Sequence, residues 1–172
     1  MIVSVIGLGY IGLPTAALIA SNGIKVVGVD VNQHVVRTIN KGKIHIIEPD
    51  LDTLVQSAVQ SGCLRATIEI EKSDVFIIAV PTPFKEDHEP DLSYIKFAAK
   101  TLATVLEKGN LVILESTSPV GTTEKLTQWI SEERPDLSFP DYLINSEADV
   151  AIAHCPETVS YTHLTLPTKR IV

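Results

Sequence analysis

Hydrophobic residues in this chain form short, nearly continuous runs that are separated by longer stretches of mixed character. The strong runs predict strands at 2–6, 26–30, 74–80, 110–115 and 149–154, and a weaker run predicts one at 65–70. The stretches between them have the apolar spacing of helices, at 12–22, 33–41, 50–61, 91–107 and 121–133. Apolar strands that alternate with helices are typical of a parallel sheet covered on both faces. The pattern therefore predicts an α/β fold with one doubly wound sheet, whose ligands bind at the carboxyl ends of the strands.

Several predicted helices begin at residues that are favoured as N-terminal caps. Asp50 and Asp91 each follow a proline and are expected to cap the helices that start there. Thr122 or Thr123, with acidic residues after it, is expected to cap the helix that runs to residue 133.

The loop after the first predicted strand has the sequence Gly-Leu-Gly-Tyr-Ile-Gly, at residues 7–12. Gly7 would permit the tight turn, Gly9 would let the backbone approach a pyrophosphate, and Gly12 would let the next helix pack closely on the strand. The helix N-terminus would add unpaired N–H groups and a partial positive charge. A turn with no ligand is the alternative, but the strand before the loop and the helix after it favour a Rossmann-like dinucleotide site.

An aspartate closes the second predicted strand, at the position where such sites hold the adenosine ribose. Asp30 would accept hydrogen bonds from the ribose hydroxyls and would repel a 2′-phosphate. The next two residues, Val31 and Asn32, offer no cation to receive that phosphate. The sequence therefore predicts NAD rather than NADP as the cofactor.

Length and charge restrict the classes of function. A chain of 172 residues with 45% hydrophobic content suits one domain with a sizeable core. The formal net charge of −7, with no basic cluster, argues against nucleic acid as a partner. Cys63 and Cys155 suit a reduced compartment, and they form no Cys/His cluster that predicts a metal site.

The first 24 residues contain no charged side chain, which by length alone would suit a membrane span. The glycines of the loop at 7–12 and Pro14 interrupt the segment, and no basic region precedes it as in a secretory signal. We therefore expect a cytoplasmic protein that is not inserted in a membrane.

Polar residues follow three of the later predicted strands. The turn Pro81-Thr82-Pro83 leaves the Thr82 hydroxyl to face a cofactor, unless the turn is only a rigid loop. Hydroxyl groups at 116–118 follow the strand at 110–115, and helix capping does not explain them. Glu157 after the last strand could act as a base or orient a water, although a single glutamate there is also typical of a solvated strand end.

Four motifs together resemble the N-terminal domain of the UDP-glucose/GDP-mannose dehydrogenase family. They are Gly7-Leu8-Gly9-Tyr10-Ile11-Gly12, Ala79-Val80-Pro81-Thr82-Pro83, Glu115-Ser116-Thr117-Ser118-Pro119-Val120-Gly121-Thr122 and Cys155-Pro156-Glu157. The segments 44–51 and 84–91 are most similar to the bacterial branch that oxidises UDP-N-acetyl-D-mannosamine.

The resemblance implies part of an enzyme that oxidises the C6 alcohol of a nucleotide sugar to a uronic acid with two NAD, through a thiohemiacetal and a thioester on a cysteine. It implies that Thr117 helps hold a water beside the nicotinamide and that Glu157 lies at the edge of the sugar site, so both are predicted catalytic residues. A hydroxyl and a carboxylate can position and polarise the water that hydrolyses a thioester. The motif positions predicted to contact NAD are Gly7, Leu8, Gly9, Tyr10, Ile11, Gly12, Asp30, Thr82, Thr117 and Thr123.

The last residues depart from the family. We expect an NAD-binding domain at 1–157 and a tail at 158–172 that derives from a truncated gene joined to a translated sequencing adapter; a natural variable C-terminus is the alternative. The family's nucleophilic cysteine and catalytic lysine belong to a second half that this chain lacks, and Cys155 does not match that nucleophile. This chain alone is therefore expected to be inactive.

The sequence is compatible with several nucleotide sugars as the substrate. UDP-N-acetyl-D-mannosamine is expected, with UDP-glucose, UDP-N-acetylglucosamine and GDP-mannose as alternatives. A non-catalytic NAD-binding module is the alternative from another class of function, which the hydroxyl groups at 116–118 and Glu157 disfavour. The full-length enzyme is expected to be a homodimer or a higher homo-oligomer in polysaccharide biosynthesis.

Overall fold

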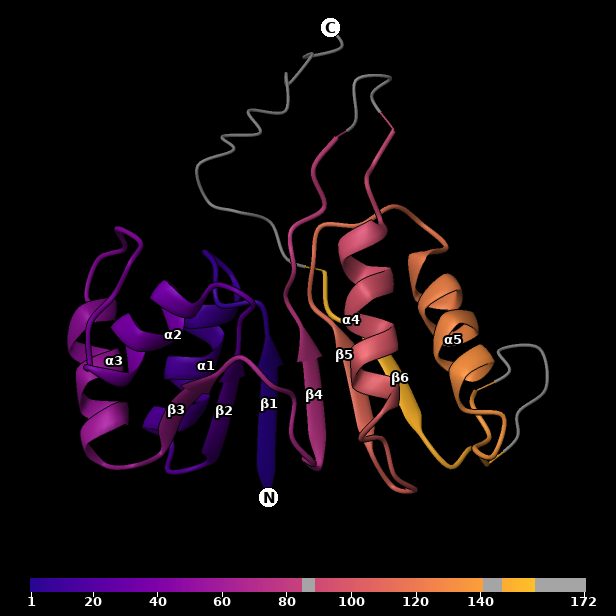
Figure 1. The fold of residues 1–172 in the computed structure, drawn as a ribbon, viewed down its shortest axis with the longest axis horizontal. Helices are drawn as coiled ribbons and strands as arrows, with labels where there is room; N and C mark the ends of the chain where they lie inside the picture. Colours follow the sequence, from indigo (N-terminus) through magenta and orange to yellow (C-terminus); the bar gives the residue numbers. More distant parts are fainter. Residues whose placement is uncertain (85–88, 141–146, 157–172) are drawn as a thin grey trace, which may run out of the picture.

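Six parallel strands form one sheet in a computed structural model that describes residues 1–84, 89–140 and 147–156 (Figure 1). The order across the sheet is β3-β2-β1-β4-β5-β6, so the direction of winding reverses between β1 and β4. The strands are β1 (Ile2–Ile6), β2 (Lys25–Val29), β3 (Leu64–Thr67), β4 (Val75–Ile78), β5 (Leu111–Leu114) and β6 (Ala151–His154). The predicted doubly wound fold is confirmed.

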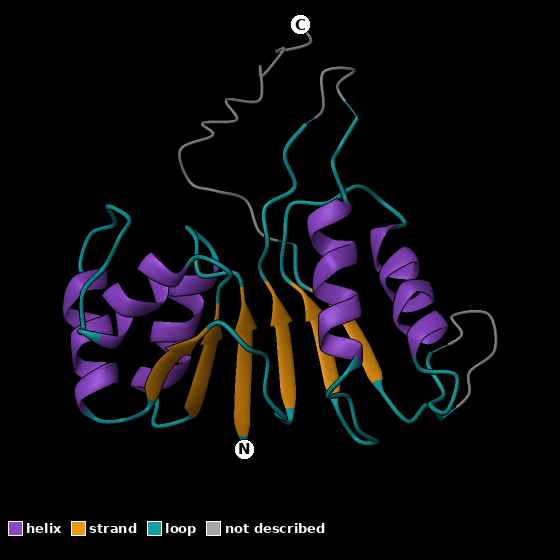
Figure 2. Ribbon diagram, viewed as in Figure 1, coloured by secondary structure: helices purple, strands orange, loops and turns teal. Residues whose placement is uncertain are grey.

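Helices cover the two faces of the sheet over different halves (Figure 2). The helices are α1 (Gly12–Ser21), α2 (Gln33–Asn40), α3 (Leu51–Gln60), α4 (Ser93–Ala103) and α5 (Thr122–Glu133). The first three pack on Val5 and Ile77, whereas α4 and α5 pack on the neighbouring residues Ile6 and Ile78, which point to the other face. The carboxyl ends of all six strands therefore meet at one edge that both helical layers leave open.

The connection from β3 to β4 contains no helix. Residues 68–74 cross the face of the sheet that carries α4, in front of β2 and β1 (Figure 1), and Ile70 packs into the core beneath α4. This crossover and α4 therefore stand on two sides of the same face.

None of the three helices begins with the predicted residue as a side-chain N-cap. Asp50 precedes α3 in a left-handed conformation with φ of 60°, and its side chain does not cap the helix. The position before α5 is Gly121, and the Thr122 hydroxyl instead donates to the Pro119 carbonyl. The N-cap of α4 is Leu92, and Asp91, one residue earlier, accepts a hydrogen bond from the amide of Ser93, the first residue of the helix, at 2.9 Å.

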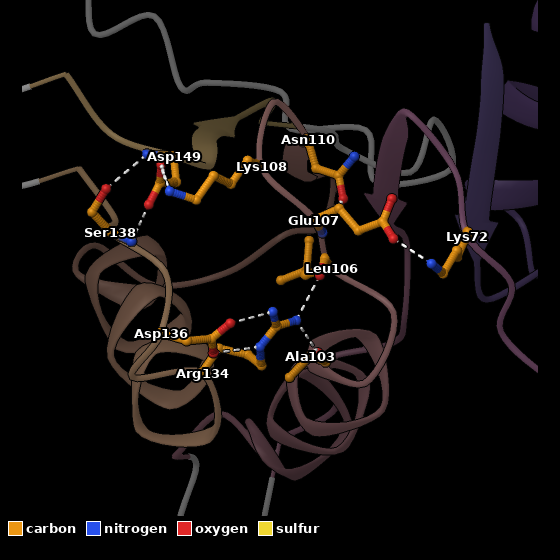
Figure 3. A network of polar contacts seen from close by, with 10 residues as sticks. All are labelled: Lys72, Ala103, Leu106, Glu107, Lys108, Asn110, Arg134, Asp136, Ser138 and Asp149. Atoms are coloured by element: carbon orange, nitrogen blue, oxygen red, sulfur yellow. Dashed lines mark hydrogen bonds and ion pairs between the residues drawn. The ribbon is translucent and has the colours of Figure 1, made fainter.

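An arginine fixes the C-terminal end of α4 (Figure 3). Arg134 Nη1 donates to the carbonyl oxygens of Ala103 and Leu106, at 3.0 and 2.6 Å. The rest of its guanidinium forms a two-bond pair with Asp136, at 2.8 and 2.7 Å. Since the last carbonyls of a helix have no partner within it, the bond to Ala103 stabilises the end of α4, and the bond to Leu106 ties the segment after the helix to the same guanidinium.

Among the described residues, no helix is both long enough and apolar enough to cross a membrane.

Candidate functional site

A cleft of about 1230 Å³ opens at the carboxyl edge of the sheet, where the winding reverses. The loops that follow β1, β2, β4 and β5 line it, and α4 and the β3–β4 crossover contribute to its sides. The predicted site residues that line it are Gly7, Leu8, Gly9, Tyr10, Ile11, Asp30, Thr82 and Thr117.

The three glycines of the first loop differ in whether the surrounding structure leaves room for a side chain. Gly7 has φ of +91°, and a Cβ there would lie 2.7 Å from the Ala79 carbonyl oxygen. A Cβ on Gly12 would lie 1.8 Å from the Gly7 carbonyl oxygen, so this residue does not line the cleft but lets α1 pack against the loop. A Cβ on Gly9 would meet nothing within 4 Å.

The surroundings of Gly9 fit a bound pyrophosphate. Because neither the backbone nor a neighbouring side chain requires glycine at this position, the open space in front of it is available to a ligand. The helix that follows has Ile11 at its N-cap, with no capping side chain and no acidic residue in its first turn. The partial positive charge of this helix end is therefore directed at the cleft with no acidic side chain in its own first turn.

Asp30 is held in place by backbone amides. Its Oδ2 accepts from the Leu8 amide at 3.0 Å, and its Oδ1 accepts from the Asn32 amide at 2.8 Å. Each carboxylate oxygen retains lone pairs that can accept from a ligand. The carboxylate is thus oriented before any ligand binds, beside the glycine loop to which it is bonded.

His45 lies near Asp30, and sequence reasoning did not predict it. The pKa of its imidazole lies below the ordinary value, chiefly because the ring is partly buried. The Asp30 carboxylate opposes this shift, and the neighbouring His34 adds to it. Its Nδ1 is buried with no hydrogen-bond partner among the described residues. No local motif marks this histidine, because the loop 41–50 brings it to Asp30 only through the fold.

Hydroxyl groups join the loops after β4 and β5. The Thr82 hydroxyl donates to the Thr117 carbonyl, so towards a ligand it can act only as an acceptor. Ser116 is 2% exposed, lines the cleft, and its Oγ has no partner in the described part of the chain. The Ser118 Oγ is also buried without a partner there. The sequence pointed to hydroxyls at 116–118 but did not single out Ser116.

Two predicted residues within the described part of the chain, Gly12 and Thr123, do not line this cleft. Thr123 lies in the first turn of α5 and is not among the residues that line the cleft. Glu157 lies outside the described residues, as does the predicted tail at 158–172. Within the residues described, no group of three or more His, Cys, Asp or Glu side chains could hold a metal ion.

Several known proteins are similar in sequence to most of this chain, including the residues that line the cleft. The sequence profile of the UDP-glucose/GDP-mannose dehydrogenase family, NAD binding domain, matches residues 1–166, whereas the predicted domain boundary is 157. The NDP-N-acetyl-D-galactosaminuronic acid dehydrogenase of Ralstonia solanacearum is 60% identical over 162 residues, 94% of this chain and 38% of that protein. The UDP-N-acetyl-D-mannosamine dehydrogenase of Campylobacter jejuni is 65% identical over 158 residues, 91% of this chain and 39% of that protein.

A solved structure agrees with these sequence matches. The UDP-D-ManNAc dehydrogenase of Pyrococcus horikoshii superposes with a TM-score of 0.82 at 42% identity, covering 92% of this chain and 37% of that one. The chain therefore spans less than two-fifths of the length of these relatives.

Proposed function

The chain belongs to the UDP-glucose/GDP-mannose dehydrogenase family, as its NAD-binding domain, and on that premise we propose that it serves the oxidation of UDP-N-acetyl-D-mannosamine to the uronic acid. The observation that carries the cofactor half of this proposal is Asp30, oriented by two backbone amides beside a glycine loop with open space at Gly9. The substrate half rests on the 65% identity to a UDP-N-acetyl-D-mannosamine dehydrogenase. The 60% identity to an NDP-N-acetyl-D-galactosaminuronic acid dehydrogenase supports a galactosamine derivative as the second candidate.

The residues that line the cleft could contact the successive parts of NAD, from the pyrophosphate to the two ends of the molecule. The amide edge at Gly9 and the N-terminus of α1 would hold the pyrophosphate, and Asp30 would accept from the adenosine ribose. Ser116, Thr82 and Thr117 would then lie towards the nicotinamide, which accepts a hydride from the sugar alcohol when NAD is bound.

We assign two catalytic roles by the same reasoning. The Thr117 side chain is exposed in the cleft wall, where a hydroxyl can hold a water near the reacting carbon. Glu157 follows β6 in the chain and would polarise that water. The thiol nucleophile and the lysine that the family requires would come from the part of the relatives that this chain does not span, together with most of the sugar pocket and the subunit interface. The proposed setting is the cytoplasm.

Calorimetric titration tests the cofactor assignment directly. The 172-residue chain should bind NAD more tightly than NADP, because Asp30 repels a 2′-phosphate. Asp30→Ala should weaken NAD binding by about tenfold or more, since hydrogen bonds to a charged group contribute about 1.5–3 kcal/mol. Asp52→Ala is the matched control, because Asp52 is exposed on α3 and does not line the cleft. Equal or tighter binding of NADP by the unaltered chain would refute the role of Asp30.

Turnover tests the substrate assignment in a longer protein that carries this domain and the remainder of the family's length. It should reduce two NAD per UDP-N-acetyl-D-mannosamine, whereas the 172-residue chain should produce no NADH with any nucleotide sugar. Preferential oxidation of the galactosamine derivative would favour the second candidate. Oxidation of neither sugar by a protein that binds NAD would refute the substrate assignment.

A further inference from the structure

The loop between α2 and α3 carries a histidine that the proposed chemistry does not use. Both chain neighbours of His45 are held in the core that α1, α2 and α3 form with the sheet: Ile46 is buried there, and Ile44 packs against it. His45 itself is partly buried, and its Nδ1 has no hydrogen-bond partner among the described residues. Since a buried polar atom without a partner is costly, a histidine at this place indicates that the rest of its ring makes a contact of value.

The ring of His45 bonds to the backbone of the glycine loop. A hydrogen bond with the Leu8 backbone raises the pKa of the imidazole, so the ring is the donor and the Leu8 carbonyl is the acceptor. The Leu8 amide is engaged elsewhere, because it donates to Asp30 Oδ2 at 3.0 Å. The backbone of Leu8 is therefore held at its amide by Asp30 and at its carbonyl by His45.

The bond to the Leu8 carbonyl determines where the next amide points. A peptide unit is planar and trans, so the Leu8 carbonyl and the Gly9 N–H point in opposite directions. His45 is not among the residues that line the cleft, whereas Gly9 lines it with open space in front. A carbonyl directed at His45 therefore turns the Gly9 N–H towards the cleft, where the pyrophosphate is proposed to bind.

The peptide between Leu8 and Gly9 has particular need of such a bond. Regular structure holds the loop on both sides of it: the Gly7 amide donates to the β2 carbonyl of Val29 at 2.8 Å. The Gly9 carbonyl accepts from the Leu13 amide of α1 at 3.1 Å. Between these points, glycine on the C-terminal side of the peptide allows it to rotate at little cost. A rotated peptide would present a carbonyl oxygen, in place of an N–H, to a bound anion.

We propose that His45 is a positioning residue for the cofactor, which holds the Leu8–Gly9 peptide with the Gly9 N–H directed at the pyrophosphate. This inference rests on the proposed NAD site and adds to it a residue from a loop that lies outside the glycine, ribose and hydroxyl motifs. The hydrogen bond from the ring also polarises the peptide, which makes the Gly9 N–H a stronger donor.

Calorimetric titration with NAD compares two substitutions of this histidine. His45→Leu removes the donor and keeps a side chain of bulk, and should weaken NAD binding by about fivefold to tenfold, as expected for one lost hydrogen bond. His45→Gln keeps an N–H donor and should retain affinity within about twofold. His34→Leu is the matched control, because His34 also lies near His45 but is exposed on α2 and does not line the cleft. It should leave NAD affinity unchanged.

An NMR titration of the unaltered chain adds a reading that a purely structural role would not change. The ring C–H signals of His45, identified by their loss in His45→Gln, should give a higher pKa when NAD saturates the site. An anion on the Gly9 N–H makes the Leu8 carbonyl a better acceptor, which favours the protonated ring. The titratable groups that face this ring are Asp30 and His34, and the loop at 7–12 has no charged side chain.

Three results would overturn the role of His45: unaltered NAD affinity in a folded His45→Leu variant, a loss that His45→Gln shares in full, or a His45 pKa that NAD leaves unchanged. If His45→Leu does not fold, the NMR titration of the unaltered chain decides. If Asp30→Ala weakens NAD binding and His45→Leu does not, the NAD site stands and the role of His45 does not. If the unaltered chain does not bind NAD, the proposed function fails as well.

Discussion

The same substitution at two glycines of one loop should have opposite consequences, and this difference tests how the loop works. In Gly12→Ala the new Cβ would lie 1.8 Å from the Gly7 carbonyl oxygen, whereas ordinary contact begins near 3.4 Å. The obstructing atom belongs to the backbone of a loop whose Gly7 amide bonds to the Val29 carbonyl at 2.8 Å. The loop therefore has to move away from β2, or α1 has to separate from the sheet.

The expected cost follows from this overlap. Alanine gains about 1 kcal/mol over glycine in a helix, but forcing an atom into a packed site costs about 1–3 kcal/mol and more where backbone must move. We expect Gly12→Ala to lower the free energy of unfolding by about 3 kcal/mol or more, among the larger effects of single substitutions.

In Gly9→Ala the protein itself meets no obstacle, because the new Cβ contacts nothing within 4 Å. The free energy of unfolding should stay the same or rise by about 0.4–1 kcal/mol, since alanine restricts the unfolded chain. The substitution should instead weaken ligand binding, because the new Cβ would occupy the space in front of the Gly9 backbone where the pyrophosphate is proposed to lie. NAD affinity should fall by about tenfold or more, which corresponds to one hydrogen bond to a charged group.

Urea unfolding followed by the fluorescence of Trp129, the single tryptophan, measures the first quantity, and calorimetric titration with NAD measures the second. A Gly12→Ala variant as stable as the unaltered chain would show that the close packing of α1 on the loop is not needed. Unchanged NAD affinity in Gly9→Ala would show that the pyrophosphate does not bind at this loop.

Two further predictions concern the contacts that hold α4. Arg134→Met should lower the free energy of unfolding by about 2 kcal/mol, because one carbonyl at the end of α4 and one in the segment after it lose a charged donor. Arg65→Met breaks only an exposed pair with Glu71 and should cost less than about 1 kcal/mol. Equal losses in urea unfolding would contradict the role of Arg134. Its guanidinium lowers the pKa of Asp136 to about 2, so the stability from this pair is present above pH 4 and is lost as the pH falls from about 4 to 2. Urea unfolding followed by circular dichroism should therefore show a lower free energy of unfolding for Asp136→Asn than for the unaltered chain at neutral pH, and equal values for the two below about pH 2. A difference in free energy that is constant across this range would refute the assignment.

The sheet and the first half of the site could be predicted because their signals are local. A run of apolar residues such as 26–29 can hardly form anything but a buried strand, and the glycine spacing at 7–12 gives each glycine a separate steric task. Asp30 was predictable for the same reason, since it directly follows β2 and bonds to the loop that defines the motif.

The features that were missed depend on contacts between distant parts of the chain. The bond from the Thr82 hydroxyl to a carbonyl 35 residues further along was not predictable, because it depends on β4 and β5 being neighbours in the sheet. Asp50 has the residue type and position of a cap, yet its backbone is left-handed and its side chain makes no cap hydrogen bond. Tyr94 and Phe97, which line the cleft from α4, were missed because nothing in the local sequence tells which side of this helix α5 covers.

These contacts also indicate which part of the cofactor site this domain completes by itself. Asp30, the glycine loop and α4 are each fixed by bonds within the described chain: to amides of residues 8 and 32, to the β2 carbonyl of residue 29, and to Arg134. The adenosine half of the cleft is therefore already organised, so that binding ADP requires little ordering of the protein. At the other end, Ser116 and Ser118 hold buried hydroxyls with no partner among the described residues. Since a buried polar group without a partner is costly, this end of the cleft gains more from a bound ligand than the adenosine end does. We therefore expect NAD, which reaches both ends of the cleft, to bind the 172-residue chain more tightly than ADP does; equal affinities in calorimetric titration would show that these hydroxyls gain nothing from the nicotinamide half.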